Sequence, residues 1–386
     1  MAGSKRGGED KSKKPLNTKF RQQTLTAWQP ILTPKYVIGS FALISIVFIP
    51  IGLSLLSTSD SVVEAVEQYD GDGADEAKYG DCFLTAEGAA AGNATLCTVS
   101  FTAEADMAKP VDVYYQITNF YQNHRRYVKS RSDAQLRGDE GIEDADLERA
   151  CDPETSYQKP AGCNLGPAFD SETSCDNANG KWTGPRIYWP CGLVANSYFN
   201  DGIALTAPAG AALDSTGIAW SSDVTARYKN PAALDTDKYA YLWDTYPNTI
   251  NPPCASPAAA APRCNAANYD ATLANAGLLD ERFMVWMRTA GLPTFRKLYG
   301  RLDRDVKAGE VVSFDVDPRF VVASFGGKKF LVLSTSSWIG GKNAFIGTAF
   351  VAVGAVALAF AAMFFAKHRV APRKLGDTRY LVWKSR

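Results

Sequence analysis

Two uncharged apolar runs constrain this chain more than any other feature of its sequence. Residues 36–56 form the first run, of 21 residues, and residues 344–366 form the second, of 23 residues. At about 1.5 Å per helical residue the runs reach roughly 31 and 34 Å, enough to cross a hydrocarbon core about 30 Å thick. Buried core helices rarely stay apolar for so long without a polar face. The sequence therefore predicts two transmembrane helices.

Charge is distributed unevenly around these runs. The 35 residues before the first run carry eight Lys and Arg against two acidic residues, and the 20 residues after the second carry seven against one. Such basic flanks are typical of the cytosolic side of a membrane. The stretch between the runs holds 26 basic and 38 acidic residues, a net charge of −12. We therefore expect cytosolic tails at 1–35 and 367–386, spans at 36–56 and 344–366, and a lumenal or extracellular domain at 57–343.

All eight cysteines fall within the predicted lumenal domain, between residues 82 and 264. There is no Cys-x-x-Cys spacing that would indicate zinc or a redox motif. An even number of cysteines in an oxidising compartment predicts four disulfides. Many pairings are possible, and short loops favour Cys82–Cys97 and Cys254–Cys264. A sequon for N-glycosylation at Asn93 lies inside the first of these loops.

The predicted lumenal domain has mostly the pattern of β-strands. Residues 111–118 and 311–316 alternate apolar and polar side chains with the period of a half-buried strand. Further elements are expected as two strands joined at Gly326-Gly327, short strands at 186–189 and 217–221, and a helix at 278–290. Together these elements predict one β-rich sandwich with long insertions and no second domain.

Two insertions are expected to be surface loops. Residues 139–149 are rich in acidic side chains but lack the ligand spacing of a calcium-binding loop, so we expect a solvated acidic loop. Residues 255–262 are composed mainly of Ala and Pro and lie between Cys254 and Cys264. This composition predicts a surface excursion closed by a disulfide.

The sequence offers little catalytic machinery. Its two histidines, His124 and His368, fall on opposite sides of the membrane in the predicted topology. Nucleotide-binding glycine motifs, the nucleophile elbow and the phosphorylation loop of P-type ATPases are absent from the sequence. Neither apolar run contains an ionisable residue that could relay protons or bind ions. We therefore expect no catalytic residues, no cofactor and no metal site.

The second apolar run carries a stripe of small side chains. The stripe recurs at steps of three and four residues and comprises Ala344, Thr348, Ala352, Ala355, Ala359, Ala362 and Ala366. We expect Gly347 and Gly354 to widen it. Small residues let helices approach closely in lipid, so the stripe predicts a helix-packing face. The alternative is a lipid-facing surface, because Ala is common in any membrane helix.

Several long blocks of sequence resemble one known family. In chain order they are NTKFRQQTLTAWQPIL and FIPIG around the first run, NFYQNHRRYVKSRSDAQLRG at 119–138, PCGLVANSYFND at 190–201, IAWSSDVTARYKNP at 218–231, FMVWMRTAGLPTFRKLYG at 283–300 and LSTSSWIGGKNAFIGTAFVAVG at 333–354. With these blocks the chain resembles the accessory β-subunits of type IV P-type ATPases, the lipid flippases. That family is also called the ligand-effect modulator or cell division control protein fifty family.

The resemblance implies an antiparallel β-sandwich exodomain and a heterodimer with the catalytic ATPase among membrane phospholipids. It implies a non-catalytic subunit that stabilises the ATPase, supports its export from the endoplasmic reticulum and its phosphorylation cycle, and so enables phospholipid translocation. The complex is then expected in the endoplasmic reticulum, in Golgi or endosomal membranes, or in the plasma membrane. The resemblance also implies a Cys151–Cys191 disulfide, which leaves Cys163 to pair with Cys175.

The segment ITNFYQNHRRYVKSR at 117–131 mixes aromatic and basic side chains, a pattern found in nucleic-acid binders. A lumenal location excludes nucleic acid as its ligand. One interpretation places the basic side chains against acidic loops of the ATPase or anionic lipid headgroups, namely Arg125, Arg126, Lys129 and Arg131. The other places the aromatic side chains in the core and pairs the basic ones within the acidic domain. For the block at 283–300 we expect Trp286, Phe295 and Tyr299 in the core.

The segments AWQP and SWIGGKN next to the apolar runs are expected at the partner interface. A core does not need an exposed Trp beside a bilayer, where amphipathic rings commonly lie. This argument predicts interface positions at Trp28, Gln29, Pro30, Trp338, Gly340, Gly341, Lys342 and Asn343, in addition to the small-residue stripe.

A homotrimeric ligand-gated channel is the competing hypothesis, because such channels also place a disulfide-rich exodomain between two spans. A conducting helix should present polar positions to water. Thr348 is the one polar residue of the second run. The sequence therefore favours the accessory subunit over a channel, and it favours an exodomain hydrolase least because no active site is evident.

Overall fold

The structure is a computed structural model that describes residues 17–26, 33–84, 95–157, 186–235, 238–246, 249–251, 253, 269–338 and 340–372. Its contacts divide the chain into two compact units. One unit contains the first long helix up to Leu56 together with the last long helix. The other contains Ser57–Asn343.

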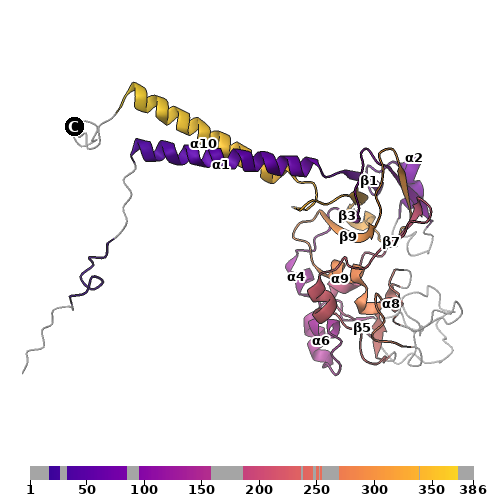
Figure 1. Ribbon diagram of the computed structural model, residues 1–386. Helices are drawn as coiled ribbons and strands as arrows, with labels where there is room; N and C mark the ends of the chain where they lie inside the picture. The colour runs from indigo at the N-terminus through magenta and orange to yellow at the C-terminus, as the bar shows by residue number, and fades with distance from the viewer. Residues whose placement is uncertain are drawn as a thin grey trace, which may run out of the picture. The chain divides into compact units, whose positions relative to one another are not determined.

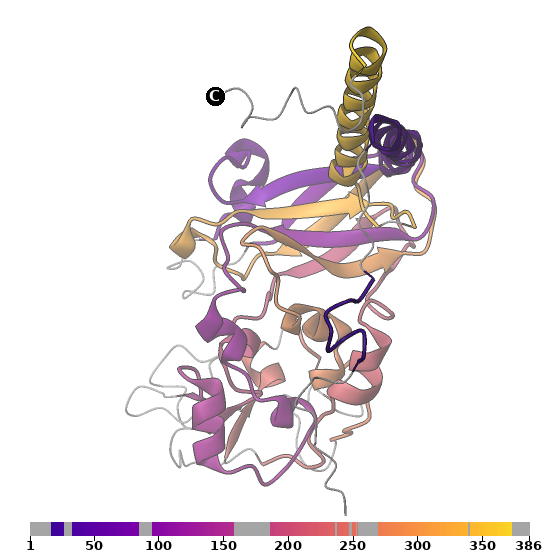
Figure 2. The same cartoon turned by 90° about the vertical axis from the view of Figure 1, so that its left-hand side faces the viewer.

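The first unit is a pair of long apolar helices, α1 (Pro34–Asp60) and α10 (Ala344–Val370), which run alongside each other (Figures 1 and 2). Helix α1 begins at Pro34, a position where the missing N–H of proline leaves no helical bond unmade, and it continues past Pro50. In the most apolar stretches of α1 and α10, 11% and 17% of the residues are buried within the chain. A core helix of a soluble protein is mostly buried, so both helices instead fit an integral membrane protein.

The second unit is built mainly on antiparallel sheet (Figure 2). Its longer strands are β1 (Glu64–Asp70), β2 (Cys97–Thr102), β3 (Val111–Ile117), β6 (Gly202–Ala207), β9 (Phe295–Leu302), β10 (Val311–Asp317) and β11 (Lys329–Ser334). One sheet has the order β1-β11-β3-β9-β7, where β7 is Leu213–Asp214, and a second has the order β2-β10-β6. Both sheets contribute side chains to a single hydrophobic core. The prediction of a mainly-β exodomain with an antiparallel sheet is therefore confirmed.

Alternation along two strands follows the predicted pattern. The side chains that face the core are buried, namely Val111, Val113, Tyr115 and Ile117 in β3 and Val312, Phe314 and Val316 in β10. Successive side chains of a strand point to opposite faces of the sheet. An apolar residue at every second position therefore identifies the buried face.

A third, smaller sheet joins β4 (Ser156–Tyr157), β5 (Arg186–Trp189) and β8 (Tyr239–Tyr241), with β5 and β8 parallel. The short strand expected at 186–189 is therefore confirmed. Short helices connect the strands: α2 (Glu76–Tyr79), α4 (Arg125–Lys129), α5 (Asp133–Leu136), α6 (Asp144–Cys151), α7 (Leu193–Asn196), α8 (Leu242–Thr245) and α9 (Glu281–Met287).

Two of the strand predictions made from the sequence are wrong. Residues 319–322 form no strand before Gly326-Gly327, because the backbone N–H groups of Arg319 and Phe320 donate to the Asp201 carboxylate. Residues 217–221 form no strand either. The backbone N–H groups of Gly217 and Ala219 donate to the Glu281 carboxylate, and these bonds take the place of a sheet ladder.

The helix expected at 278–290 is shorter than predicted. Residues Gly277–Leu279 form a 3-10 turn, and Asp280 then caps α9 by accepting a hydrogen bond from the backbone N–H of Arg282. At the other end, the ammonium of Lys297 takes the carbonyl groups that a longer helix would use. Long-range partners thus set both ends of the helix.

The acidic segment expected to be a loop is helical over its second half. Helix α6 buries Leu147 and Cys151, which lie four residues apart on one face. Its first turn carries Asp144 and Asp146, which interact favourably with a helix N-terminus. The prediction of a loop over 139–149 is therefore wrong for its second half, because an acidic segment can still form a short amphipathic helix.

Two disulfides join described parts of the second unit. Cys82 is bonded to Cys97, and Cys151 is bonded to Cys191. The remaining predicted pairs, Cys163–Cys175 and Cys254–Cys264, lie outside the described residues, as do Asn93 and the segment 255–262.

Candidate partner-binding surfaces

Helix α10 uses a glycine face to pack against α1. Gly347, Gly354, Ala357 and Ala361 are buried on this face. A Cβ built on Gly347 would lie 2.8 Å from Leu56 Cγ, and one built on Gly354 would lie 2.7 Å from Ile49 Cγ1. The two backbones therefore approach more closely than any larger side chain permits.

The small-residue stripe of α10 lies on a different face. Thr348, Ala352, Ala355 and Ala359 are all exposed within the described part of the chain. The expectation that Gly347 and Gly354 widen this stripe is wrong, because α1 covers both glycines. Helix α10 therefore has a glycine face that α1 occupies and a separate stripe of small side chains that stays exposed in the described chain.

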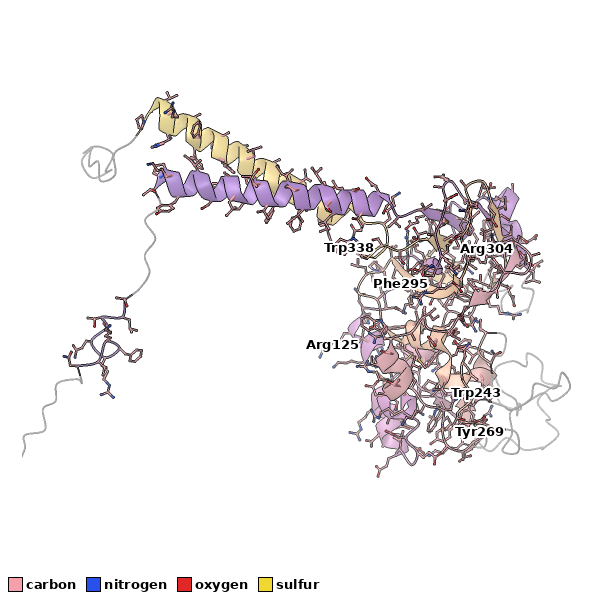
Figure 3. The ribbon with its side chains drawn as sticks, viewed as in Figure 1. Arg125, Trp243, Tyr269, Phe295, Arg304 and Trp338 are labelled. Carbon is pink, nitrogen blue, oxygen red and sulfur yellow. A yellow bond between two sulfur atoms is a disulfide. The ribbon has the colours of Figure 1, made fainter. Side chains whose placement is uncertain are left out.

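The segment before α10 displays an aromatic side chain on a small closed loop. Trp338 is 80% exposed, and Figure 3 labels it on the ribbon. The backbone N–H of Ser337 donates to the carbonyl of Gly340, and that of Gly340 donates back to the carbonyl of Ser337. Gly340 has a φ of 115°, which a residue with a Cβ rarely adopts. After the loop, Gly341, Lys342 and Asn343 are exposed as well.

Helix α4 divides the basic residues of segment 117–131 into two groups. Arg126 forms an ion pair with Asp152 at 3.3 Å, and Arg131 forms one with Asp133 at 3.1 Å. Arg125 and Lys129 are exposed and have no ion-pair partner among the described residues. Figure 3 shows Arg125 at the outer side of α4.

The aromatic side chains of the same segment have a different role. Tyr127 is buried, and Phe120 packs against the rings of Trp286 and Phe295. Trp286 and Phe295, together with Tyr299, are buried as the sequence predicts. Phe120 and Tyr127 therefore belong to the core, whereas Tyr121, Arg125 and Lys129 are exposed.

A buried ionic cluster ties distant segments of the sheet region together. Lys329 and Asp201 are fully buried, with 2.8 Å between Nζ and the nearer carboxylate oxygen. Asp70 lies 3.0 Å from the same ammonium, and burial raises the pKa of the Asp70 carboxyl. The other Asp201 oxygen accepts two backbone hydrogen bonds of 2.6 Å. One ammonium thus serves two carboxylates, and the cluster joins these segments inside the unit without offering an open site.

Lys297 is a second buried cation, and it faces carbonyl groups. Its ammonium donates to the carbonyl oxygens of Val285, Trp286 and Arg288 at 3.2, 2.6 and 2.7 Å. Burial lowers the pKa of Lys297 to about 7. The side chain closes the C-terminal end of α9, where cations interact favourably with the free carbonyls.

Sequence reasoning missed one exposed aromatic residue. Trp220 is 67% exposed, and the guanidinium of Arg288 lies 4.8 Å from its ring centroid. The block IAWSSDVTARYKNP contains this Trp, but neither composition nor periodicity separates an exposed Trp from a core one. The predicted interface residues Trp28, Gln29 and Pro30 lie outside the described residues.

Little in these surfaces resembles a catalytic centre. The imidazole of His124 is exposed and has no hydrogen-bond partner in the described part of the chain. Among the same residues, no three His, Cys, Asp or Glu side chains form a group that could hold a metal ion. The exposed features are instead small side chains on α10, aromatic rings and cations, and Trp and Arg are residue types enriched in protein interfaces.

These features define a class of protein. Its members have two apolar helices that fit a membrane and, between these helices in the sequence, a disulfide-bonded antiparallel β-domain. The chain belongs to the LEM3 (ligand-effect modulator 3) family / CDC50 family, whose model matches residues 55–374. It is 36% identical to ALA-interacting subunit 3 of Arabidopsis thaliana, covering 99% of this chain and 94% of the relative. It is 35% identical to Cell cycle control protein 50A of Bos taurus, covering 91% and 88%.

A yeast relative carries a more explicit name. The chain is 32% identical to the Phospholipid-transporting ATPase accessory subunit CRF1 of Saccharomyces cerevisiae, over 98% of this chain and 91% of the relative. The names of such relatives describe accessory subunits, not catalytic ones.

Proposed function

We propose that this chain is the non-catalytic accessory subunit of a type IV P-type ATPase. It forms a heterodimer with the ATPase, stabilises it, supports its export from the endoplasmic reticulum and its phosphorylation cycle, and so enables phospholipid translocation. Both termini are cytosolic, and the complex resides in the endoplasmic reticulum, in Golgi or endosomal membranes, or in the plasma membrane.

The names of the relatives support a partner of this class. One relative is named as a subunit that interacts with ALA, and another as the accessory subunit of a phospholipid-transporting ATPase. The similarity extends over nearly the whole chain and includes both long helices.

The geometric observation that supports the proposal is the pair of faces on α10. Its glycine face is filled by α1, and its face of Thr348, Ala352, Ala355 and Ala359 is uncovered in the described chain. In lipid no hydrophobic effect drives helices together, so association depends on close packing between small side chains. The uncovered face is the one through which a membrane helix of the ATPase packs.

Affinity purification of the full chain from mild detergent tests the proposal. We expect a large P-type ATPase to co-purify in stoichiometric amount and to be identified by mass spectrometry. A homotrimer of this chain without such a band would contradict the proposal and favour the two-span channel.

Substitutions on α10 test the face itself. Ala352→Leu, Ala355→Leu and Ala359→Leu together are expected to lower ATPase recovery, because three isobutyl groups in place of methyl groups separate the two backbones. A matched control, Ile346→Leu with Val353→Leu and Val356→Leu, changes exposed positions off the stripe. Equal recovery from both triple variants would remove the stripe from the interface.

A further inference from the structure

Trp220 is exposed on a segment that is unusually well fixed. The five residues Asp223–Arg227 form a π-helix, a rare element that occurs frequently at functional sites. The backbone N–H groups of Asp223 and Val224 both donate to the carbonyl of Trp220, at 2.8 and 3.1 Å. On the preceding side, Glu281 accepts from the backbone N–H groups of Gly217 and Ala219. The chain is therefore held on both sides of the indole.

A buried carboxylate fixes the cation that braces the ring. Asp223 is 1% exposed, and one of its oxygens accepts a hydrogen bond of 2.6 Å from Arg288 Nε. The Arg288 guanidinium then lies over the Trp220 ring at 4.8 Å from its centroid. The carbonyl of Arg288 is held in turn by Lys297 Nζ at 2.7 Å. Side chain and backbone of Arg288 are thus both fixed before any partner arrives.

Some binding capacity of this pair is left unused. A guanidinium has five N–H donors, and within the described chain the Nε–H of Arg288 has a hydrogen-bond partner while its terminal nitrogens have none. The Arg288 side chain is 41% exposed. A rigid Trp beside a rigid Arg with free donors is the composition of a binding hot spot, because neither side chain loses much freedom on association.

We propose that Trp220 and Arg288 anchor the β-rich unit to an extramembrane segment of the partner ATPase. The segment supplies an apolar hollow for the indole and a carboxylate for the terminal nitrogens of Arg288. This inference rests on the proposed function and assigns it a site outside the membrane.

The charges around Trp220 favour a protein partner over an anionic membrane. Arg227 lies 3.7 Å from the second oxygen of Asp223, so Asp223 offsets one of the two neighbouring arginines. Recognition of anionic lipid surfaces commonly uses clusters of about four to eight unpaired Lys or Arg. The Trp220 site has instead one net positive charge beside one large ring, which suits a single carboxylate at the rim of an apolar hollow.

Trp220→Ala in the full chain is the first test. Because the ring is exposed, the substitution is expected to leave the yield and thermal midpoint of the purified chain unchanged. Capture of the ATPase should fall on the order of tenfold or more, as for an interface hot spot, and Trp220→Phe should recover part of it. Val311→Ala is the matched control, since Val311 is 48% exposed on β10. Capture by Trp220→Ala equal to that by wild type would overturn the inference.

Photo-crosslinking separates the possible occupants. In the full chain, Trp220 is replaced by p-benzoylphenylalanine and the complex is irradiated in native membranes. An adduct with the ATPase supports the inference, whereas adducts with lipid alone, or none, overturn it. Failure of the wild-type chain to capture any ATPase would instead refute the proposed function, so the two failures are distinguishable.

Discussion

Gly52 of α1 and Gly347 of α10 face each other across the helix pair. A Cβ built on Gly52 would lie 2.9 Å from the carbonyl oxygen of Gly347, and one built on Gly347 would lie 3.0 Å from that of Gly52. A Cβ on either glycine would therefore clash with the backbone of the other helix, so this approach requires glycine at both positions.

Gly347→Ala is expected to destabilise the helix pair by about 1–3 kcal/mol, the usual cost of overpacking a tight contact. The measurement is the thermal midpoint of the full chain in detergent. Gly39→Ala is the matched control, because Gly39 lies in α1 and a Cβ there meets nothing within 4 Å. Equal thermal midpoints for the two variants would show that the close approach at Gly347 does not contribute to the stability of the chain.

The buried cluster around Asp201 predicts a large effect from removing one cation. Lys329→Met leaves Asp201 and Asp70 without their ammonium partner, and such an uncompensated buried charge costs about 3–5 kcal/mol. Denaturant unfolding of the full chain measures the loss. Lys78→Met is the control, since the Lys78–Glu67 pair is partly exposed and should contribute about 1 kcal/mol or less. Similar losses for both variants would contradict a special role for the cluster.

The buried ammonium of Lys297 predicts a dependence of stability on pH. Its pKa is about 7 in the folded chain, against about 10.4 in an unfolded one. Between these values the unfolded chain holds a proton that the folded chain has lost, so the free energy of unfolding rises with pH by up to about 1.4 kcal/mol per unit. Below pH 7 both states are protonated and this residue contributes no slope.

The comparison of wild type with Lys297→Met isolates this contribution. Unfolding midpoints are measured from pH 6 to 9, and the wild-type curve should rise relative to that of the variant above pH 7. Lys109 forms an exposed ion pair with Asp303, so the curve of Lys109→Met against pH should run parallel to that of wild type. Parallel curves for all three proteins would show that Lys297 keeps an ordinary pKa.

The proposed topology predicts that Asn93 carries a glycan. Asn93-Ala-Thr95 is the one N-glycosylation sequon of the sequence, and the proposed orientation places it in the lumen. Glycosidase treatment should lower the apparent mass of the chain by one N-glycan. Thr95→Ala should give the same lower mass without treatment. An unmodified wild-type chain would argue against a lumenal position for this loop.

Features with a local period could be predicted from the sequence, whereas features that depend on distant residues could not. The two long helices and the alternation in β3 and β10 follow from hydrophobic patterns within single segments. The missing strand before Gly326 follows from Asp201, more than a hundred residues away. Helix α6 did carry a local signal, Leu147 and Cys151 four residues apart, which its acidic composition obscured.

The candidate surfaces show the same division. The sequence identified the small side chains of α10, but the side of the helix that α1 covers depends on tertiary packing at Gly347 and Gly354. The sequence showed that segment 117–131 mixes aromatic and basic side chains. Which arginines are paired depends on Asp133 and Asp152, whose positions relative to the segment follow only from the fold. The exposure of Trp220 depends on Glu281, Asp223 and Arg288, which no local pattern connects.

Strand order in the larger sheet has a consequence for biosynthesis. Strand β1 is an edge strand whose hydrogen-bonded neighbour is β11, so Gln68 near the start of the domain pairs with Phe330 near its end. At roughly 5–20 residues per second, a ribosome needs on the order of 10–50 s to synthesise the intervening chain. During this time β1 has no sheet partner, and the domain cannot close until its last strand has entered the compartment. A nascent chain truncated before β11 should therefore be held by chaperones rather than fold.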